Sequence, residues 1–351
     1  MKHLPLLAAI LLAGCSSPQP LAQQNRTLDA QTAGASYNCT HERVYAALLS
    51  TRIHRLSGQN PVVGVFNSRD GGSSWSHSGW PQGRHFAVVT EPGTCGVVRY
   101  VAAGNGLFRT TDDGASWRIT TGWQQTEIQD AAVNTISPNI VLSATPYGIY
   151  RSTNRGDSWS EASSGLSQRF VSSVRFDRTN AQIALAGTES GVYISTDSGQ
   201  TWQPTNLREP VRSVRQSPDN PGVWIAGLQH KGAAVSRDFG RSWQLSAPLD
   251  GKTMYEIEFG VGEEELWAGG WEVGVWYSPD LGRSWEQRSE GIAYPSIHAI
   301  AVSRAHPGRV WAGSMGGGLY VSNDHGKSWQ AANPDIFDAG QIWDLYIDTE
   351  Q

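Results

Sequence analysis

The chain has 351 residues, with 27 lysine and arginine residues against 32 aspartate and glutamate residues, and a formal net charge of −5 at pH 7. No segment forms a basic stripe, so nucleic acid is not expected as a partner. A chain of this length could hold two domains, but the internal repeat described below favours one closed domain.

The first 15 residues predict an export signal that ends in a lipid-attachment site. A charged start, residues 1–3, precedes an apolar run over residues 4–12 that is too short to span a bilayer. Residues 12–15 read Leu-Ala-Gly-Cys and resemble the bacterial lipobox, which implies that Cys15 is lipidated and becomes the first mature residue. Because Ser16 follows, the outer membrane is the expected location if the cell is Gram-negative. The alternative is an ordinary signal peptide, with which Cys15 is lost.

The rest of the chain divides into a tether and a folded domain. Residues 16–36 are polar and of low complexity, and we expect a flexible tether there. Residues 37–351 are expected to form a single domain, and no further membrane segment is recognisable in them.

An eight-residue phrase, Ser/Thr-x-Asp-x-Gly-x-x-Trp, occurs seven times in this domain. Its third residue recurs every 41–44 residues, which indicates a repeat architecture. Its acidic or amide side chain can accept backbone N–H groups and its glycine permits a positive φ, while the tryptophan is an apolar anchor. We therefore assign the phrase to structure. The seven third residues are Asp70, Asp112, Asn154, Asp197, Asp238, Asp280 and Asp324.

Each repeat contains four short runs rich in β-branched and aromatic residues, as in residues 170–177, 183–186, 191–197 and 201–204. These runs predict four antiparallel strands, A to D, with the phrase as the hairpin between C and D. Seven such units predict an all-β fold, a seven-bladed β-propeller of four-stranded antiparallel blades.

The ends of the repeat region predict how the ring closes. Residues 43–50 read as strand B of blade 1 with no strand A before them, and residues 341–348 read as a strand A after the last blade. We expect this C-terminal strand to complete blade 1.

Two cysteines remain after Cys15, namely Cys39 and Cys95. An even number in an oxidising compartment favours a disulfide. On the strand template both lie on the same face of adjacent blades, so we expect a structural Cys39–Cys95 bridge.

The D–A and B–C connections of a propeller lie on one face, here called the loop face, and the phrases lie on the other. Aromatic and charged residues in the connections of the loop face are not required by the repeat, which favours a binding surface. The alternative is that several cap blade edges. The candidates are Trp80, Arg84, Trp123, Tyr147, His230, Trp271 and Tyr294, with Phe337 in the last D–A connection.

The innermost strands add two columns of polar and aromatic residues at matched depth. The sequence leaves open which column faces the central channel, and whether these groups satisfy one another or form a site. The first column reads Gln129, Ser172, Arg212, Tyr255, His298 and Trp343. The second reads Asp130, Ser173, Ser213, Glu256, Ala299 and Asp344. Arg212, Tyr255, His298 and Trp343 are the binding candidates among them.

The seven phrases resemble those of the Asp-box (BNR) repeat superfamily over residues 43–348. That superfamily includes sialidases, xyloglucanase-type hydrolases, the sortilin luminal domain and the photosystem II assembly factors. The layout is most similar to the assembly factors, which are single seven-bladed propellers with a lipobox in cyanobacterial members. The resemblance implies a tethered platform that binds protein. No arginine cluster of the kind those proteins display is evident, so only this class is carried over.

The enzymes of the superfamily fit less well. A sialidase needs a tyrosine and a glutamate acting together, but Tyr255 and Glu256 are adjacent, and neighbouring side chains of a strand are expected to point to opposite sides. A xyloglucanase-like enzyme has two propellers and an acid/base carboxylate pair. Here that pair would come from Asp130, Glu256 and Asp344.

The leading hypothesis is therefore a lipid-anchored, non-enzymatic scaffold of the cell envelope that holds a protein partner on its loop face. The alternative is a carbohydrate-binding or glycoside-hydrolase-like protein, with glycan as the ligand. A third hypothesis is a purely structural envelope protein. We expect a monomer with no cofactor and no metal.

Overall fold

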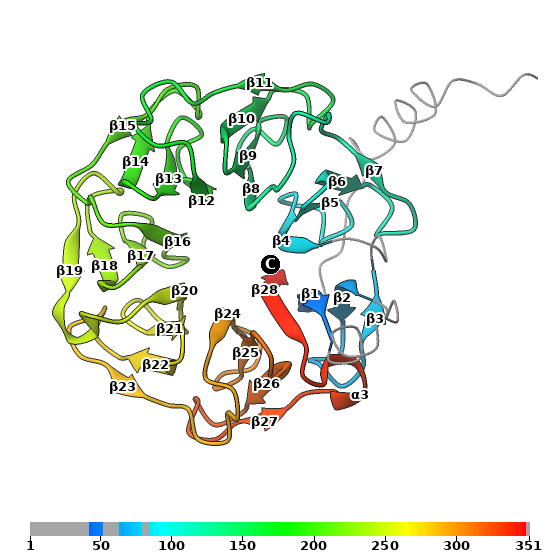
Figure 1. Ribbon diagram of the computed structural model, residues 1–351, viewed down its shortest axis with the longest axis vertical. Helices are drawn as coiled ribbons and strands as arrows, with labels where there is room; N and C mark the ends of the chain where they lie inside the picture. Colours follow the sequence, from blue (N-terminus) through cyan, green and yellow to red (C-terminus); the bar gives the residue numbers. More distant parts are fainter. Residues whose placement is uncertain (1–41, 52–62, 79–83, 349–351) are drawn as a thin grey trace, which may run out of the picture. The chain divides into compact units, whose positions relative to one another are not determined.

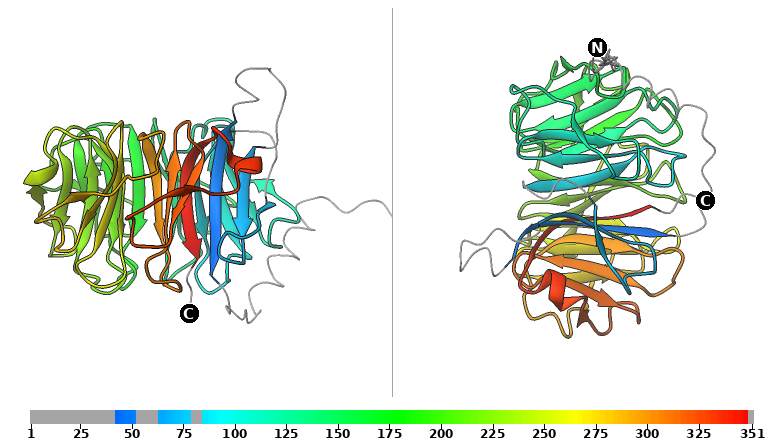
Figure 2. Two further views of the ribbon diagram at one scale, coloured as in Figure 1. Left: turned by 90° about the horizontal axis from the view of Figure 1, so that it is seen from below. Right: turned by 90° about the vertical axis from the view of Figure 1, so that its right-hand side faces the viewer.

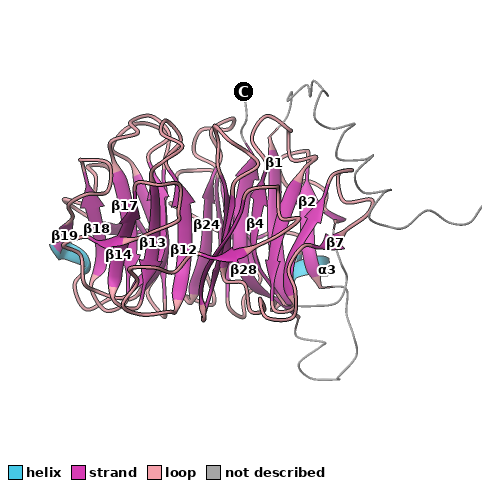
Figure 3. Ribbon diagram, turned by 90° about the horizontal axis from the view of Figure 1, so that it is seen from above, coloured by secondary structure: helices cyan, strands magenta, loops and turns pink. Residues whose placement is uncertain are grey.

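The computed structural model describes residues 42–51, 63–78 and 84–348, all within one compact unit, Tyr37–Gln351. They form seven four-stranded antiparallel sheets arranged as a ring (Figure 1). The predicted seven-bladed propeller is confirmed. Its strands run between two faces on which the connections lie (Figures 2 and 3).

Blades 1 to 4 follow one pattern, with strand A innermost. Blade 1 contains β28 (Gln341–Asp348), β1 (Arg43–Ser50), β2 (Gly64–Ser68) and β3 (Ser76–His77). Blade 2 contains β4 (His85–Thr90), β5 (Arg99–Ala103), β6 (Gly106–Thr110) and β7 (Arg118–Ile119). Blade 3 contains β8 (Asp130–Val133), β9 (Val141–Thr145), β10 (Gly148–Ser152) and β11 (Ser160–Glu161). Blade 4 contains β12 (Val171–Phe176), β13 (Ala184–Thr188), β14 (Gly191–Ser195) and β15 (Gln203–Pro204).

Blades 5 to 7 repeat the pattern and add two short helices. Blade 5 contains β16 (Val211–Gln216), β17 (Trp224–Leu228), β18 (Gly232–Ser236) and β19 (Gln244–Ser246), followed by η1 (Ala247–Leu249). Blade 6 contains β20 (Met254–Phe259), β21 (Leu266–Gly270), β22 (Gly274–Ser278) and β23 (Glu286–Gln287). Blade 7 contains β24 (Ile297–Val302), β25 (Val310–Ser314), β26 (Leu319–Ser322) and β27 (Gln330–Ala331), and α3 (Pro334–Phe337) leads into β28.

The ring closes as predicted. β28 lies antiparallel to β1, with Tyr45 opposite Tyr346 and Ala46 opposite Leu345. The first and last strands of the repeat region therefore share one sheet, and β28 lies beside the innermost strand of blade 2, where Thr90 Oγ1 and the Tyr346 hydroxyl are 2.8 Å apart.

Each eight-residue phrase forms a tight hairpin stabilised by its own side chains. In blade 5, Ser236 Oγ donates to Asp238 Oδ1 at 2.8 Å, and the same carboxylate oxygen accepts the Ser242 N–H at 2.8 Å. Ser236 Oγ also accepts the N–H of Gly240, whose φ is +78°. The structural role assigned to the phrase is confirmed.

Phe337 lies in the last D–A connection, as predicted. Its side chain is 1 % exposed and its ring packs 5.1 Å from Trp75 and 5.5 Å from Phe66, so its expected place on a binding surface is wrong. Cys95 lies between β4 and β5 at φ +49°, whereas Cys39 lies outside the described residues, so the disulfide stays a prediction.

Cys15 and the tether, residues 16–36, also lie outside the described residues. Within the described ranges no helix is long and apolar enough to cross a membrane.

Candidate functional site

Exposed aromatic side chains are concentrated on the loop face. Trp123 lies between β7 and β8 and is 85 % exposed, and Tyr294 lies between β23 and β24 and is 57 % exposed. Tyr147 and Trp271 lie in the B–C turns of blades 3 and 6 and are 54 % and 49 % exposed. In the described part of the chain, the other exposed large aromatic is Phe239, which lies in a phrase on the opposite face. Four of five such aromatics therefore share one face, on both sides of the channel.

The remaining loop-face candidates are polar or lie outside the described residues. His230 is exposed in the β17–β18 turn at φ +61°. Arg84 directly precedes β4, and its guanidinium lies 5.3 Å from the centre of the Phe86 ring. Trp80 lies outside the described residues.

A one-residue bulge in strand A decides which column faces the channel. In six of the seven blades the ladder between strands A and B skips one residue of strand A, as between Val171 and Ser173 or Met254 and Glu256. A bulge re-aims side chains relative to a regular strand, so both columns line the channel. The skipped residues are Phe86, Ser172, Arg212, Tyr255, His298 and Trp343.

This arrangement corrects one expectation. Tyr255 and Glu256 were expected to point to opposite sides of a regular strand, but the bulge at Tyr255 lets both line one cavity. The alternation argument failed because it assumed an unbroken ladder.

That cavity, here called the mouth cavity, lies where the innermost strands begin and has a volume of about 180 Å³. Residues from all seven blades line it, including every member of both columns except Ala299. Sites that enclose a drug-sized ligand usually measure ~300–1,000 Å³. The mouth cavity can therefore hold one side chain or a small group, and not a length of oligosaccharide.

One side of the mouth cavity is an arc of aromatic rings. Tyr255 stacks on His298 with ring centres 3.9 Å apart, and His298 lies 5.1 Å from Trp343. The arc continues from Trp343 to Phe86 at 5.4 Å, and Trp271 flanks Tyr255 at 6.4 Å. The first-column candidates Tyr255, His298 and Trp343 are thus brought together, and Trp271 joins them from the loop face.

The basic member of the first column is already engaged. Arg212 donates to Glu189 Oε1 at 2.7 Å and to Gln229 Oε1. The imidazole of His298 is buried, which lowers its pKa to about 4. His298 is therefore neutral at physiological pH.

Below the arc, the carboxylates of the second column meet two arginines that the sequence analysis did not single out. Asp130 pairs with Arg175, and Glu256 pairs with Arg215 at 2.8 Å. Arg215 also reaches Glu258 at 3.3 Å. Arg175 and Arg215 occupy the same place in consecutive repeats, so extending the column comparison two residues along strand A would have found them.

The third carboxylate, Asp344, is held differently. Its Oδ2 accepts the Val88 N–H at 2.8 Å, and within the described residues it forms no ion pair. Burial raises the pKa of Asp344 to about 6 and that of Glu256 to about 8, although Arg215 acts in the opposite direction on both.

Several buried polar atoms around the mouth cavity have no hydrogen-bond partner in the described structure. They include the hydroxyls of Ser173 and Ser213, which are 2 % and 3 % exposed, and Nε2 of His298. Arg212 Nε is a further unpartnered donor. Unsatisfied buried groups in a native structure call for an explanation, and here they line a cavity that a ligand can enter. Among the described residues, no group of three or more His, Cys, Asp or Glu could hold a metal ion.

Comparison with known proteins agrees with this architecture. The family model described as sortilin, neurotensin receptor 3, matches residues 147–262, and the BNR/Asp-box repeat model matches residues 320–331. A comparison with curated protein sequences gives no match.

Several solved structures share the fold. An ancestral GH74 enzyme is 20 % identical with a TM-score of 0.58, and the match covers 77 % of this chain and 38 % of that one. YCF48 bound to D1 peptide is 18 % identical with a TM-score of 0.55, covering 72 % of this chain and 82 % of that one. YCF48 from Cyanidioschyzon merolae is 18 % identical with a TM-score of 0.58, covering 76 % and 91 %. The chain therefore spans less than half of the GH74 enzyme and most of YCF48.

These likenesses show the fold. Together with the seven phrases and the closed ring, they define the chain as a seven-bladed β-propeller built from Asp-box repeats.

Proposed function

We propose that this propeller is a non-enzymatic scaffold that holds a polypeptide partner against its loop face. The observation that carries the proposal is the placement of Trp123, Tyr147, Trp271 and Tyr294, which are all exposed in connections of the loop face. Exposed aromatics of this kind are the usual anchors of protein interfaces. YCF48, a neighbour of similar layout, has been solved with a D1 peptide bound, which supports a polypeptide as the class of partner.

The state of the channel carboxylates supports a binding role over hydrolysis. Asp130 and Glu256 are paired with Arg175 and Arg215, and Asp344 accepts a backbone N–H. A glycosidase needs one carboxyl group free to donate a proton to the substrate and another free to attack or to activate water. Carboxylates held by arginine do not offer that freedom, and the small cavity leaves no room for a sugar chain between them.

A double substitution on the loop face tests the scaffold proposal. Trp123→Ala combined with Trp271→Ala should abolish capture of the partner in a crosslinking pull-down from the native cell envelope. The melting temperature should stay the same, because both side chains are about half exposed or more. Phe239→Ala, which removes an exposed aromatic from the opposite face, is the matched control and should capture normally. Undiminished capture by the double variant would exclude the loop face.

We also propose that the propeller is tethered to the envelope by lipid on Cys15, because residues 12–15 match the lipobox pattern. Cys15→Ser should release the protein from the membrane fraction and leave the signal uncleaved by the lipoprotein peptidase. Ser17→Ala, two residues further on, should fractionate with membranes as the wild type does. If Cys15→Ser remains in the membrane fraction, the anchor lies elsewhere.

A further inference from the structure

The middle of the channel carries more acidic than basic groups. Four carboxylates and two arginines meet there. All four carboxylates lie close enough to Arg215 to raise the pKa of the Arg215 guanidinium. The carboxylates belong to Asp130, Glu256, Glu258 and Asp344, and the arginines are Arg175 and Arg215. Charges held in a protein interior are costly unless they are paired. The site is therefore two positive charges short of neutrality when all four carboxylates are ionised.

Asp344 is the carboxylate that is best placed to receive a cation from outside. It lines the mouth cavity, its Oδ2 is held by the Val88 N–H, and its other oxygen makes no hydrogen bond within the described residues. The closing strand therefore holds the carboxylate in position, and its second oxygen is available to a ligand.

The wall and floor of the mouth cavity complement a cation in two further ways. The rings of Tyr255 and Trp343 line the cavity, and the electron-rich faces of aromatic rings attract cations, most strongly when water is excluded. The hydroxyls of Ser173 and Ser213 and the neutral His298 Nε2 are unpartnered, and all three can accept hydrogen bonds. The basic group at this rim, Arg212, is already neutralised by Glu189.

We infer that the mouth cavity binds a primary ammonium group, supplied by a lysine side chain of the polypeptide partner. The assignment of this group to a partner's lysine rests on the scaffold function proposed above. An ammonium carries three donors on a compact charge, whereas a guanidinium is planar and favours paired, coplanar acceptors. The separate acceptors around the cavity and its volume of about 180 Å³ fit the ammonium better.

Calorimetric titration of the complete propeller with small probes tests this inference. N-acetyl-lysine methylamide should bind. N-acetyl-norleucine methylamide, which keeps the four side-chain carbons but lacks the ammonium group, should bind at least about tenfold more weakly because it has no charge to pair with the carboxylates. The arginine analogue should also bind more weakly than the lysine probe. Equal binding of the lysine and norleucine probes, or no binding of the lysine probe, would overturn the inference.

Asp344→Asn provides the sharpest variant. An asparagine Oδ1 still accepts the Val88 N–H, so the strand junction is kept while the charge is removed. Affinity for the lysine probe should fall at least about tenfold with little change in melting temperature. Phe239→Ala, on the opposite face, should bind the probe as the wild type does. Unchanged affinity in Asp344→Asn would place the ammonium elsewhere and contradict the assignment.

Protonation supplies a second readout. Asp344 is surrounded by Asp130, Arg175, Arg215 and Glu256, and burial raises the pKa of Asp344 to about 6 and of Glu256 to about 8. A bound cation favours the ionised carboxylates, so binding near pH 7 should release protons, and affinity should rise from about pH 5 to about pH 8. Titrations in buffers of different ionisation enthalpy measure this release. Affinity that does not change over this range would contradict the inference.

One comparison distinguishes a free amine from a polypeptide lysine as the source of the ammonium group. A second distinguishes failure of this inference from failure of the scaffold proposal. If n-butylamine binds more tightly than the lysine probe, the ligand is a free amine and the link to a polypeptide is wrong. If the lysine probe does not bind while partner capture persists and requires Trp123, this inference fails and the scaffold proposal stands. If the lysine probe binds but no partner is captured, the scaffold proposal fails and the ammonium site in the mouth cavity stands.

Discussion

At the scale of single residues, the glycine of each Asp-box does two tasks. It adopts a positive φ, and it approaches the preceding blade: a Cβ at Gly240 would lie 2.5 Å from Leu185 Cδ1, and a Cβ at Gly199 would lie 2.7 Å from Leu142 Cδ2. Leu142 and Leu185 are fully buried on the second strand of their blades. The glycine is therefore required by the packing between blades as well as by the turn.

A pair of substitutions separates these two tasks. Gly240→Ala should lower the free energy of unfolding by about 2–4 kcal/mol, because it combines backbone strain with overpacking against Leu185. Gly251 has a similar φ, +82°, but a Cβ added there would meet no atom within 4 Å, so Gly251→Ala should cost only about 1 kcal/mol. Urea denaturation of both variants measures the difference. Equal losses would show that inter-blade packing at Gly240 contributes nothing.

At the scale of elements, regular features were predictable and irregular ones were not. The seven boxes, the blade count and the closing strand follow from a period and from alternating runs, and β1 and β28 have the predicted bounds. Those signals depend on local chemistry that every repeat must satisfy. The bulge in strand A is different, because skipping one residue leaves no mark in a pattern of alternating residues.

The bulge accounts for what the sequence left open at the site. Without it, one column would face the channel and the other the blade interior, so the stacked Tyr255 and His298 could not share a cavity with Glu256. Most residues of the site were named from sequence, although Arg175 and Arg215 were not, and the grouping of the named residues depends on this irregularity. Phe337 shows the opposite error, because a loop position gave no sign that its ring fills the core beside Trp75.

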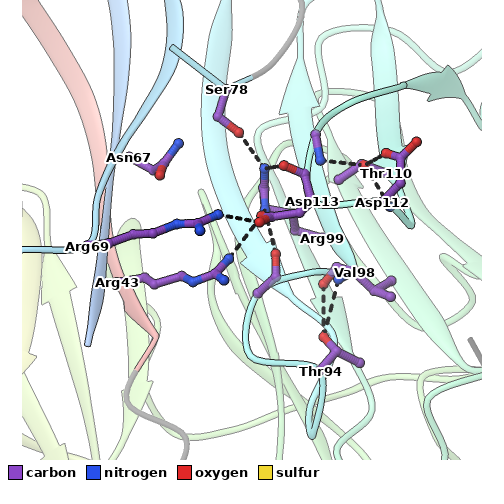
Figure 4. Close-up of polar contacts among 12 residues, drawn as sticks. Arg43, Asn67, Arg69, Ser78, Thr94, Val98, Arg99, Thr110, Asp112 and Asp113 are labelled. Carbon is purple, nitrogen blue, oxygen red and sulfur yellow. Dashed lines mark hydrogen bonds and ion pairs between the residues drawn. The ribbon is translucent and has the colours of Figure 1, made fainter. Parts of the chain in front are cut away.

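At the scale of the whole molecule, blade 1 is the joint that closes the ring. It contacts blade 7 through Glu42, which accepts from Ser303 Oγ at 2.7 and 2.9 Å, and through Arg309, which donates to Gly71 O at 3.1 Å. It contacts blade 2 through a cluster centred on Asp113 (Figure 4). Each blade of a closed propeller packs against two neighbours, so closure of the ring depends on both contacts of blade 1.

The Asp113 cluster concentrates charge at the junction of blades 1 and 2. Arg43 and Arg99 lie 2.9 and 2.7 Å from Asp113 Oδ1, and Arg69 contacts Oδ2. Arg99 is fully buried and also donates to Ser78 Oγ. Asp113 is therefore the carboxylate counter-charge of a buried arginine, and it ties two residues of blade 1 to blade 2.

Asp113→Ala should therefore weaken the whole ring. Removing one partner leaves Arg99 charged and buried, which should cost about 3 kcal/mol of unfolding free energy. Burial raises the pKa of Asp113, but Arg99, Arg43 and Arg69 together hold it below its ordinary value. A lowered pKa means that this stabilisation is present above the unfolded-state pKa, about 3.9, and is lost as the pH falls below it.

Denaturation curves measured across the acid range check both parts of this prediction. The wild type should lose stability more steeply than Asp113→Ala as the pH falls below about 4, and the two should converge at the acid end. Asp157→Asn, which removes the exposed partner of Arg118, is the matched control and should cost less than about 1 kcal/mol. Parallel pH profiles for the wild type and Asp113→Ala would mean that the cluster is screened by solvent and that ring closure rests on the strand pairing of β28 with β1.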